Sequence, residues 1–366
     1  MSKYNEVNSK TLCKNILNKI KELTDERINI MEVCGTHTVA IFRSGLRELL
    51  PKNINLISGP GCPVCVTPTS EIDHIIALAR MKNTIIVTFG DMINVPGTNS
   101  SLKIEKAKGA NIQIIYSPIQ CLEIAVKNPN QNVVLIGIGF ETTTPLLASV
   151  VLEAAKDSVP NFYFFSLAKL MPPIMRELLQ KKDAKLDGFL CPGHVSAIIG
   201  TEPYQFIPSE YHIPCVIAGF EPEDILIAIY HIVLQKRNKV ACVENGYKRV
   251  VRKEGNPTAL EKMSEVFTHT NSSWRGIGIV AKSGLDLKEK YRKMNARNFE
   301  VDIEKTQENH DCRCGDVLKG VITPLQCPLF RKVCTPENPI GACMVSSEGS
   351  CAAFYKYSTE SLVKNI

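Results

Sequence analysis

The stretch Asn29-Ile-Met-Glu-Val-Cys-Gly-Thr-His37 decides the fold, because a short apolar run ends abruptly in cysteine, glycine and histidine. The same order recurs in Ile54-Asn-Leu-Ile-Ser-Gly-Pro-Gly-Cys-Pro-Val-Cys65. Apolar runs of this length that stop at glycine or proline are typical of buried strands. In parallel α/β sheets, the loops at the carboxyl ends of the strands form the ligand crevice. We therefore predict two strands whose following loops carry the chemistry.

Strand and helix patterns alternate outward from these two segments. The predicted strands are Asn29–Val33, Ile54–Ser58, Thr84–Phe89, Ile112–Tyr116, Val133–Gly137, Phe162–Leu167, Gly188–Cys191 and Cys215–Ala218. The predicted helices are Glu71–Met81, Leu146–Lys156, Pro173–Lys181 and Asp224–Gln235. This alternation indicates an α/β fold with parallel sheets covered by helices on both faces.

The number of strands predicts two tandem α/β/α domains. We assign residues 1–127, with the Cys34, Cys62 and Cys65 loops, to the first domain and residues 128–245 to the second. An N-terminal helix within residues 1–26 can pack elsewhere. Residues 246–366 lack the alternation and are rich in cysteine, so we predict a smaller C-terminal domain organised around a cofactor.

Composition narrows the class of protein. The 366 residues are 44% hydrophobic and 22% charged, which is ordinary for a soluble domain. The net charge of +6 is spread along the chain with no basic block between aromatics, so we expect no nucleic-acid partner. Apolar runs are too short to span a membrane, and residues 1–10 lack a signal-peptide pattern. We therefore expect a cytoplasmic protein.

The spacing of Cys62 and Cys65 allows a reversible disulfide, and half of a zinc site is the alternative. Cys34 stands alone with His37 three residues later. It is predicted to be a thiolate ligand or nucleophile, with His37 as proton acceptor or as a donor to the ligand. The alternative is a buried cysteine that acts as a small hydrophobe.

Three further strand ends carry unusual peptides, and we predict that all five ends converge on one cleft. These peptides are Phe89-Gly90-Asp91, Gly139-Phe-Glu-Thr-Thr-Thr-Pro145 and Cys191-Pro-Gly-His194. Glu141 could orient a thiol, a base or a partner, and an ordinary capping loop explains it nearly as well. His194 has the same two interpretations.

The most specific pattern is in the tail. Six of the 14 cysteines occur there, at Cys312, Cys314, Cys327, Cys334, Cys343 and Cys351. Four thiolates suit a [4Fe–4S] cluster, and the remaining two could form a redox disulfide beside it. A zinc knuckle or three structural disulfides are the alternatives. Disulfides conflict with a reducing cytosol, and the long spacings fit zinc poorly.

Together these peptides resemble the HypD family of [NiFe]-hydrogenase maturation factors over nearly the whole chain. The matching stretches are Met31–His37, Gly59–Cys65, Gly139–Pro145, Cys191–Ser196, Trp274–Gly278, Cys327–Phe330 and Gly341–Gly349. The resemblance implies a scaffold that forms a complex with a HypC-type chaperone and holds an iron atom. That iron would receive two cyanides through a HypE-type donor and one carbon monoxide, before it enters the hydrogenase large-subunit precursor.

The resemblance also implies roles for individual cysteines. It places the iron-binding thiolate at Cys34 and a cleft disulfide at Cys62 and Cys65. The tail is similar to the catalytic subunit of ferredoxin–thioredoxin reductase, in which a [4Fe–4S] cluster adjoins a redox disulfide. By that similarity the cluster ligands and the disulfide partners are assigned as follows: Cys312, Cys327, Cys334 and Cys351 hold the cluster, and Cys314 and Cys343 form the disulfide. The division between Cys312 and Cys314 stays open.

The expected function is an assembly scaffold for an Fe(CN)2CO unit, with redox activity but without conventional turnover. A cluster and a thiol/disulfide relay would supply electrons. The alternative is a thiol–disulfide oxidoreductase that acts on a protein substrate through Cys62 and Cys65.

Overall fold

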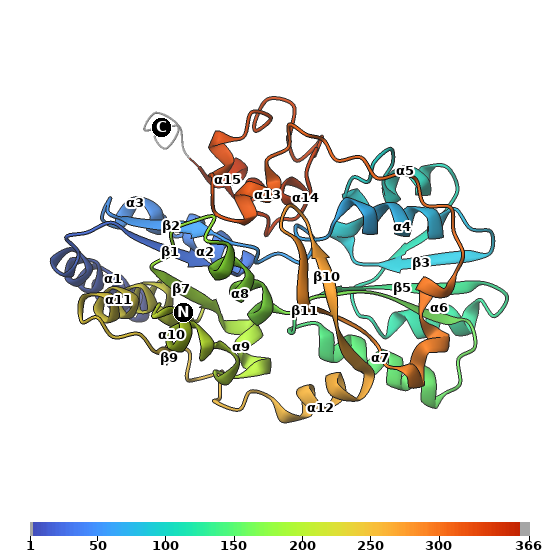
Figure 1. Cartoon of the computed structure of the whole chain (residues 1–366), viewed down its shortest axis with the longest axis horizontal. Helices are drawn as coiled ribbons and strands as arrows, with labels where there is room; N and C mark the ends of the chain where they lie inside the picture. Colours follow the sequence, from blue (N-terminus) through green and yellow to red (C-terminus); the bar gives the residue numbers. More distant parts are fainter. Residues whose placement is uncertain (1–2, 359–366) are drawn as a thin grey trace.

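Two parallel β-sheets organise the computed structural model, which describes residues 3–358 (Figure 1). The first sheet has the strand order β2-β1-β7-β8-β9 and the second has the order β4-β3-β5-β6. An antiparallel hairpin of β10 and β11 lies between them (Figure 1). The strands are β1 (Ile28–Glu32), β2 (Ile54–Ser58), β3 (Thr84–Thr88), β4 (Asn111–Ile114), β5 (Asn132–Gly139), β6 (Phe162–Ala168), β7 (Gly188–Pro192), β8 (Cys215–Ala218), β9 (Val243–Asn245), β10 (Phe267–Trp274) and β11 (Gly278–Leu287).

Helices connect the strands and cover the sheets. They are α1 (Lys3–Leu23), α2 (Gly35–Arg43), α3 (Leu46–Leu49), α4 (Thr69–Ala79), α5 (Leu102–Ala107), α6 (Gln120–Lys127), α7 (Thr144–Lys156), α8 (Met171–Lys181), α9 (Gly193–Ile199), α10 (Phe206–Tyr211), α11 (Pro222–Arg237), α12 (Pro257–Val266), α13 (Cys314–Leu318), α14 (Ala342–Val345) and α15 (Ser350–Tyr357). The N-terminal helix α1 packs on α11 and buries Ile16 and Ile20. No helix within residues 3–358 is long and apolar enough to cross a membrane.

The eight predicted strands and the four predicted helices are confirmed to within a few residues. The α/β class with parallel sheets is confirmed as well. Burial on both faces explains why the strands of the parallel sheets were recognisable in the sequence. In β3, Ile85 and Val87 face one hydrophobic core while Ile86 faces another, so every position of the strand is apolar or buried. Burial of each such side chain stabilises the fold by about 1.5–3 kcal/mol.

The two sheets do not follow one another along the chain, and the predicted tandem order was wrong. Strand β1 pairs with β7, with Ile30 opposite Gly188, so both sheets take strands from either side of residue 127. The second sheet is built from the segment between β2 and β7. Pairing between distant strands leaves no local signal, because each strand has the same apolar pattern in either sheet.

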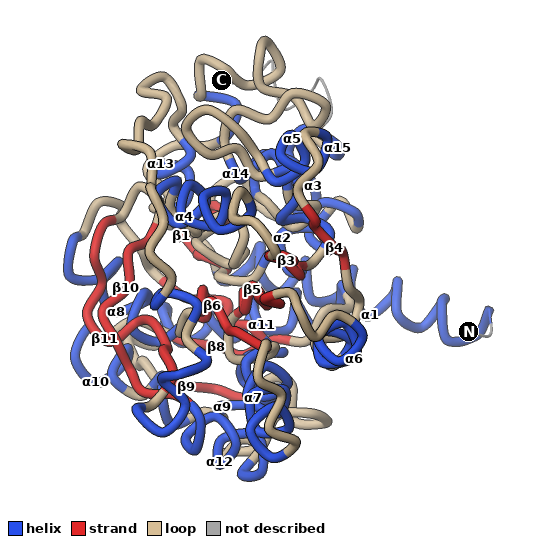
Figure 2. Tube along the Cα trace, turned by 90° about the vertical axis from the view of Figure 1, so that its right-hand side faces the viewer, coloured by secondary structure: helices blue, strands red, loops and turns tan. Residues whose placement is uncertain are grey.

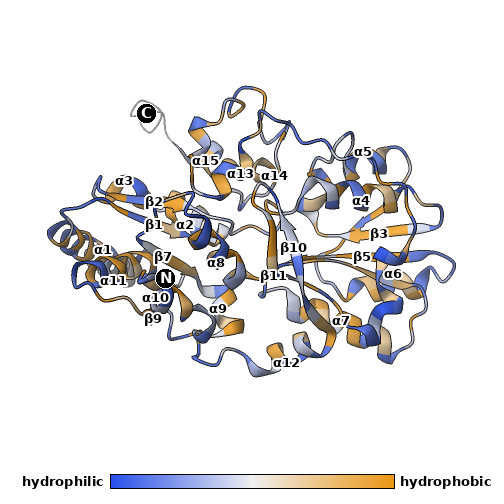
Figure 3. Cartoon of the chain, viewed as in Figure 1, coloured by the Kyte–Doolittle hydropathy of each residue, from blue (hydrophilic) through white to orange (hydrophobic). Residues whose placement is uncertain are grey.

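The C-terminal third contains more regular structure than we predicted. The hairpin of β10 and β11 packs on β6 and α8, and α12 packs on α7. Figure 3 shows why the hairpin was missed, since β10 is largely hydrophilic whereas the strands of the parallel sheets are hydrophobic. The cysteine-rich tail and α12 lie at opposite ends of the molecule (Figures 1 and 2). The predicted C-terminal domain also includes residues 359–366, which lie outside the described residues.

Candidate functional site

The carboxyl ends of β1 and β2 bring the Cys34 loop against the Cys62 loop. The two strands are adjacent and parallel, with Glu32 opposite Ser58. The Gly35 N–H donates to the Gly61 carbonyl oxygen at 3.1 Å, directly before Cys62. A Cβ on Gly61 would lie 2.3 Å from the Cys34 nitrogen, so this close approach requires glycine. The lone cysteine and the first cysteine of the pair therefore lie on neighbouring loops.

Cys34 is nearly enclosed by polar groups, with 9% of its surface exposed. Burial raises the pKa of its thiol to about 12, although the backbone amides of His37 and Thr36 favour the thiolate. The Glu32 carboxylate accepts the Cys34 N–H at 3.2 Å. Burial also raises the pKa of Glu32 to about 7. Without a cation, Cys34 is therefore a protonated thiol at neutral pH.

His37 and His194 lie on Phe220, which follows β8. Their rings stack on the phenyl ring at centroid distances of 4.7 Å and 4.0 Å. His37 Nε2 lies 2.9 Å from the Gly219 carbonyl oxygen, so Nε2 carries the hydrogen and Nδ1 is the basic nitrogen. Within residues 3–358, His37 Nδ1 has no hydrogen-bond partner. Burial lowers the pKa of His37 to about 4, so the ring is neutral.

The sulfur atoms of the Cys62 loop and of the tail meet behind this site. The Cys65 N–H donates to Cys62 Sγ at 3.3 Å, and Cys314 Sγ lies 2.7 Å from Cys343 Sγ. The Cys343 thiol also interacts with the thiols of Cys65 and Cys351. The two pairs that we predicted as redox partners are therefore neighbours, joined at Cys65 and Cys343.

The six tail cysteines line one small cavity. Its other walls are Leu329, Phe330, Met344 and Gly341, so the space between the thiols is apolar. Among the described residues, no three His, Cys, Asp or Glu side chains are placed to share a single metal ion. That finding concerns a mononuclear site, whereas the ligands of a cubane cluster attach to four different irons and lie farther apart. An apolar cavity walled by thiols suits a [4Fe–4S] cluster in its donor atoms and its exclusion of water.

Two of the five predicted strand ends do not join the site. Asp91, after β3, is exposed. Glu141, after β5, accepts the Met171 N–H at 2.9 Å, and within residues 3–358 its Oε2 has no partner. Its carboxylate instead lies near Tyr204, whose pKa is raised by burial and by the charges of Cys191 and Glu141. The other three predicted ends, those of β1, β2 and β7, do converge, and the end of β8 joins them through Phe220.

A known family matches this chain from residue 11 to residue 358. It is the HypD family, described as "hydrogenase formation hypA family". The chain belongs to the HypD family. The Escherichia coli K12 hydrogenase maturation factor HypD is 46% identical over 337 residues, which cover 91% of this chain and 90% of that protein. A hydrogenase maturation factor HypD from Cupriavidus necator is 44% identical, covering 91% of this chain and 90% of that protein.

An archaeal relative extends the comparison. A putative hydrogenase expression/formation protein of Methanocaldococcus jannaschii is 42% identical over 355 residues, covering 96% of this chain and 98% of that protein. The match therefore includes both sheets, the hairpin and the tail of this HypD chain.

Sequence reasoning on this HypD chain gave no role to Arg275, although it lies within the quoted Trp274–Gly278 peptide. The Arg275 N–H donates to the Val66 carbonyl oxygen at 2.9 Å, and Arg275 Nε donates to the Thr67 carbonyl oxygen at 2.8 Å. The tip of the hairpin is thereby tied to the loop after Cys65. Burial alone would raise the pKa of Cys65, but the Cys343 and Cys62 thiols and the Arg275 charge lower it to about 6.

Two glycines fit the same hairpin tip against the tail. Gly276 has a φ of +66°, and a Cβ there would lie 2.1 Å from the Gly315 Cα. This contact places the hairpin tip beside Cys314. The glycines after Trp274 could have indicated this contact from the sequence, because glycine is often needed where two backbone segments approach closely.

Glu348 was also missed, and it joins the tail to the Cys34 loop of this HypD chain. The Thr36 hydroxyl donates to Glu348 Oε1 at 2.8 Å. A Cβ on Gly35 would lie 2.5 Å from the Glu348 Cβ, so the tail packs directly on the first turn of α2. The carboxylate of Glu348 therefore faces the lone cysteine.

Proposed function

We propose that this HypD-family chain is a hydrogenase maturation factor that serves as the scaffold for an Fe(CN)2CO unit. The iron is the cargo, and Cys34 supplies the thiolate that holds it. The observation that carries this proposal is the packing of the Cys34 loop on the Cys62 loop, with the tail thiols directly behind. Low-spin iron with cyanide ligands prefers soft thiolate donors, and Cys62 is the neighbouring thiol that can complete the site.

The burial of Cys34 supports a metal ligand over a free nucleophile. A nucleophilic cysteine needs a lowered pKa, whereas burial raises that of Cys34 to about 12. A bound cation removes the proton and supplies the missing counter-charge. The neutral His37 ring, with a free Nδ1, offers a hydrogen-bond acceptor beside the site. His37 and His194 would then position ligands rather than bind the iron.

The adjoining thiols support an exchange of disulfides between tail and cleft. Cys343 gives its thiol proton to Cys314, whose pKa the hydrogen bond from Cys343 lowers, and attacks Cys65 Sγ. The Cys62–Cys65 bond breaks, and Cys62 leaves as a thiolate that takes up a proton. Cys314 then attacks Cys343, which releases Cys65 and leaves a Cys314–Cys343 disulfide. One disulfide forms and one is broken, so two electrons pass from the tail pair to the cleft pair. The lowered pKa of Cys65 favours its departure in the second step.

A [4Fe–4S] cluster held by Cys312, Cys327, Cys334 and Cys351 would supply the electrons that reduce the tail pair again. The chain's own contribution is to exclude water from that cavity and to hold Cys343 against Cys65. A HypC-type chaperone, a HypE-type cyanide donor and a hydrogenase large-subunit precursor are the partners that this function requires.

Infrared spectroscopy on anaerobically prepared protein tests the scaffold. The wild-type chain, produced with the three partners, should show stretching bands of iron-bound cyanide and carbonyl. Cys34→Ala should lose the bands together with the cargo iron, whereas Cys242→Ala, at an exposed cysteine, should keep them. Full bands in the Cys34→Ala protein would contradict the proposal.

The alternative function is a thiol–disulfide oxidoreductase that acts on a protein substrate, and the burial of its two working cysteines disfavours it. Cys62 and Cys65 are 3% and 0% exposed, beneath the tail near Ala342. A protein substrate could reach them only if the tail moved away. Disulfide reductase activity that survives Cys34→Ala would favour the alternative, because such an enzyme does not need the lone cysteine.

A further inference from the structure

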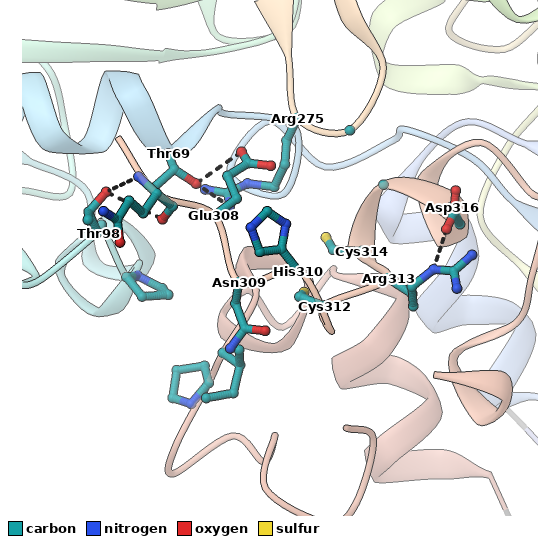
Figure 4. A pocket seen from close by; sticks show the side chains of 17 residues that line it. Thr69, Thr98, Arg275, Glu308, Asn309, His310, Cys312, Arg313, Cys314 and Asp316 are labelled. Carbon is teal, nitrogen blue, oxygen red and sulfur yellow. Dashed lines mark hydrogen bonds and ion pairs between the residues drawn. The ribbon is translucent and has the colours of Figure 1, made fainter. Parts of the chain in front are cut away.

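A polar cavity of about 440 Å³ opens beside the tail (Figure 4). Its walls come from the start of α4, the loop before α5, the hairpin tip and residues 307–316. The volume lies in the range of small-molecule sites, roughly 300–1,000 Å³. Cys314 of the tail pair lies in its wall, but neither iron binding at Cys34 nor the exchange of disulfides requires a ligand in this cavity.

Arg275 is buried in the wall of the cavity with an unused donor. Its side chain is 8% exposed. Arg275 Nε donates to the Thr67 carbonyl oxygen, and Nη1 donates to the Thr69 hydroxyl at 2.9 Å. Within residues 3–358, Nη2 has no hydrogen-bond partner. A buried, unpaired guanidinium N–H is costly, so an acceptor from a bound molecule would relieve it.

The start of α4 adds positive potential at the same place. This helix begins at Thr69, which lines the cavity and is 4% exposed, and it continues for 11 residues. The amides of a helix's first turn have no partner within the helix, and its macrodipole is positive at that end. A helix N-terminus beside an arginine is a common arrangement for binding carboxylate or phosphate groups.

Two carboxylates line the cavity, and one of them is paired with cations. Asp316 forms ion pairs with Arg313 and Lys319. Glu308, which is exposed, accepts the Thr69 hydroxyl at 3.2 Å and has no cationic partner within 4 Å among residues 3–358. Glu308 is therefore the one carboxylate among the lining residues that opposes an anion at Arg275.

Two thiols form part of the wall. Cys312 and Cys314 line both this cavity and the cysteine-lined cavity of the tail. Residues 312–314 therefore lie between the polar cavity, which is open to solvent, and the apolar cavity of the tail. Figure 4 shows both sulfur atoms near the residues that line the polar cavity.

We propose that this cavity binds a small molecule carrying a carboxylate or phosphate group, with that group at Arg275 and Thr69 and the remainder beside Cys314. The proposal goes beyond the scaffold function and does not depend on it. The ligand class follows from one buried guanidinium with an unpaired N–H and one helix N-terminus, opposed by a single carboxylate without a cationic partner.

The test uses two alkylating reagents of similar size and different charge. Iodoacetate is an anion and iodoacetamide is neutral. The full-length, reduced protein is treated with each reagent, and rates are measured at single cysteines by peptide mass spectrometry. Trypsin cleaves after Arg313, so Cys312 and Cys314 fall in separate peptides. The exposed Cys242 serves as the control thiol in the same chain.

The iodoacetate-to-iodoacetamide rate ratio at Cys314 should exceed that at Cys242 by about tenfold, because the anion is bound before it reacts. Arg275→Gln should abolish the excess. Glu308→Gln should increase it, and this exposed substitution leaves the Arg275 hydrogen bonds intact. Glu289→Gln, at a distant and exposed carboxylate, should leave the ratio unchanged.

Competition identifies the ligand chemistry. Acetate or inorganic phosphate should slow the reaction of iodoacetate at Cys314 without affecting Cys242. The ion that protects Cys314 at the lower concentration identifies the anionic group that the cavity binds. The proposal is overturned if the ratio at Cys314 equals or falls below that at Cys242. It is also overturned if Glu308→Gln leaves the ratio unchanged.

Discussion

Gly61→Ala should separate the two cysteine loops at the centre of the site. The new Cβ would lie 2.3 Å from the Cys34 nitrogen and 2.5 Å from the Cys34 Cα. Ordinary contacts between such atoms are about 3.5–4.0 Å, so the loops must move apart by about 1 Å or more. Backbone atoms cannot rotate away as a flexible side chain could. Overpacking of this kind costs about 1–3 kcal/mol.

The same movement breaks the hydrogen bond from the Gly35 N–H to Gly61, which contributes about 0.5–1.5 kcal/mol. We therefore expect Gly61→Ala to lower the free energy of unfolding by about 2–4 kcal/mol in urea denaturation. Gly90→Ala is the matched control, because its Cβ would lie 3.9 Å from Ile114 in ordinary contact. The cargo iron should also be lost from Gly61→Ala. A variant with wild-type stability and full iron content would refute the reasoning.

Two predictions concern pH. Burial raises the pKa of Glu141 to about 7, so its ionisation weakens the fold as pH rises from about 4.5 through 7. Glu141→Gln should therefore be more stable than wild type at pH 8.5, by up to about 3 kcal/mol, and equal to it at pH 4, in urea denaturation. A hydrogen bond from Arg80, with help from Ser100 and Lys108, lowers the pKa of Glu105 to about 2. Its stabilisation is present above about pH 4.5 and is lost as pH falls toward 2, so Glu105→Gln should cost about 1 kcal/mol at pH 7 and progressively less in acid. A pH-independent difference in either series would contradict the assignment.

The local structure of the parallel sheets could be predicted from the sequence because it depends on neighbours along the chain. Parallel strands that are buried on both faces are largely apolar, as in β3 with Ile85, Ile86 and Val87 at its centre, and each ends at a recognisable turn. Which strands pair is a property of the whole chain. Pairing of Ile30 with Gly188 joins residues 158 positions apart, and no pattern within either strand reports it.

The cysteines of the site were predictable, whereas the groups that act on them were not. Thiols are chemically distinctive, so Cys34 and the Cys62 loop could be selected by residue type and spacing alone. Arg275 and Glu348 are common residues on remote segments, and their roles depend on the hairpin and the tail folding back onto the first sheet. Glu141 resembled a site residue because it follows a strand, but that strand belongs to the other sheet.

Disulfide trapping between the cleft and the tail tests the central claim most directly. In a Cys62→Ser/Cys314→Ser double variant, Cys65 and Cys343 each lack their own partner. Mild oxidation with diamide should then join Cys65 to Cys343, and non-reducing peptide mapping should recover the cross-linked peptides. Recovery of both thiols unlinked, in protein that is still folded, would contradict the account.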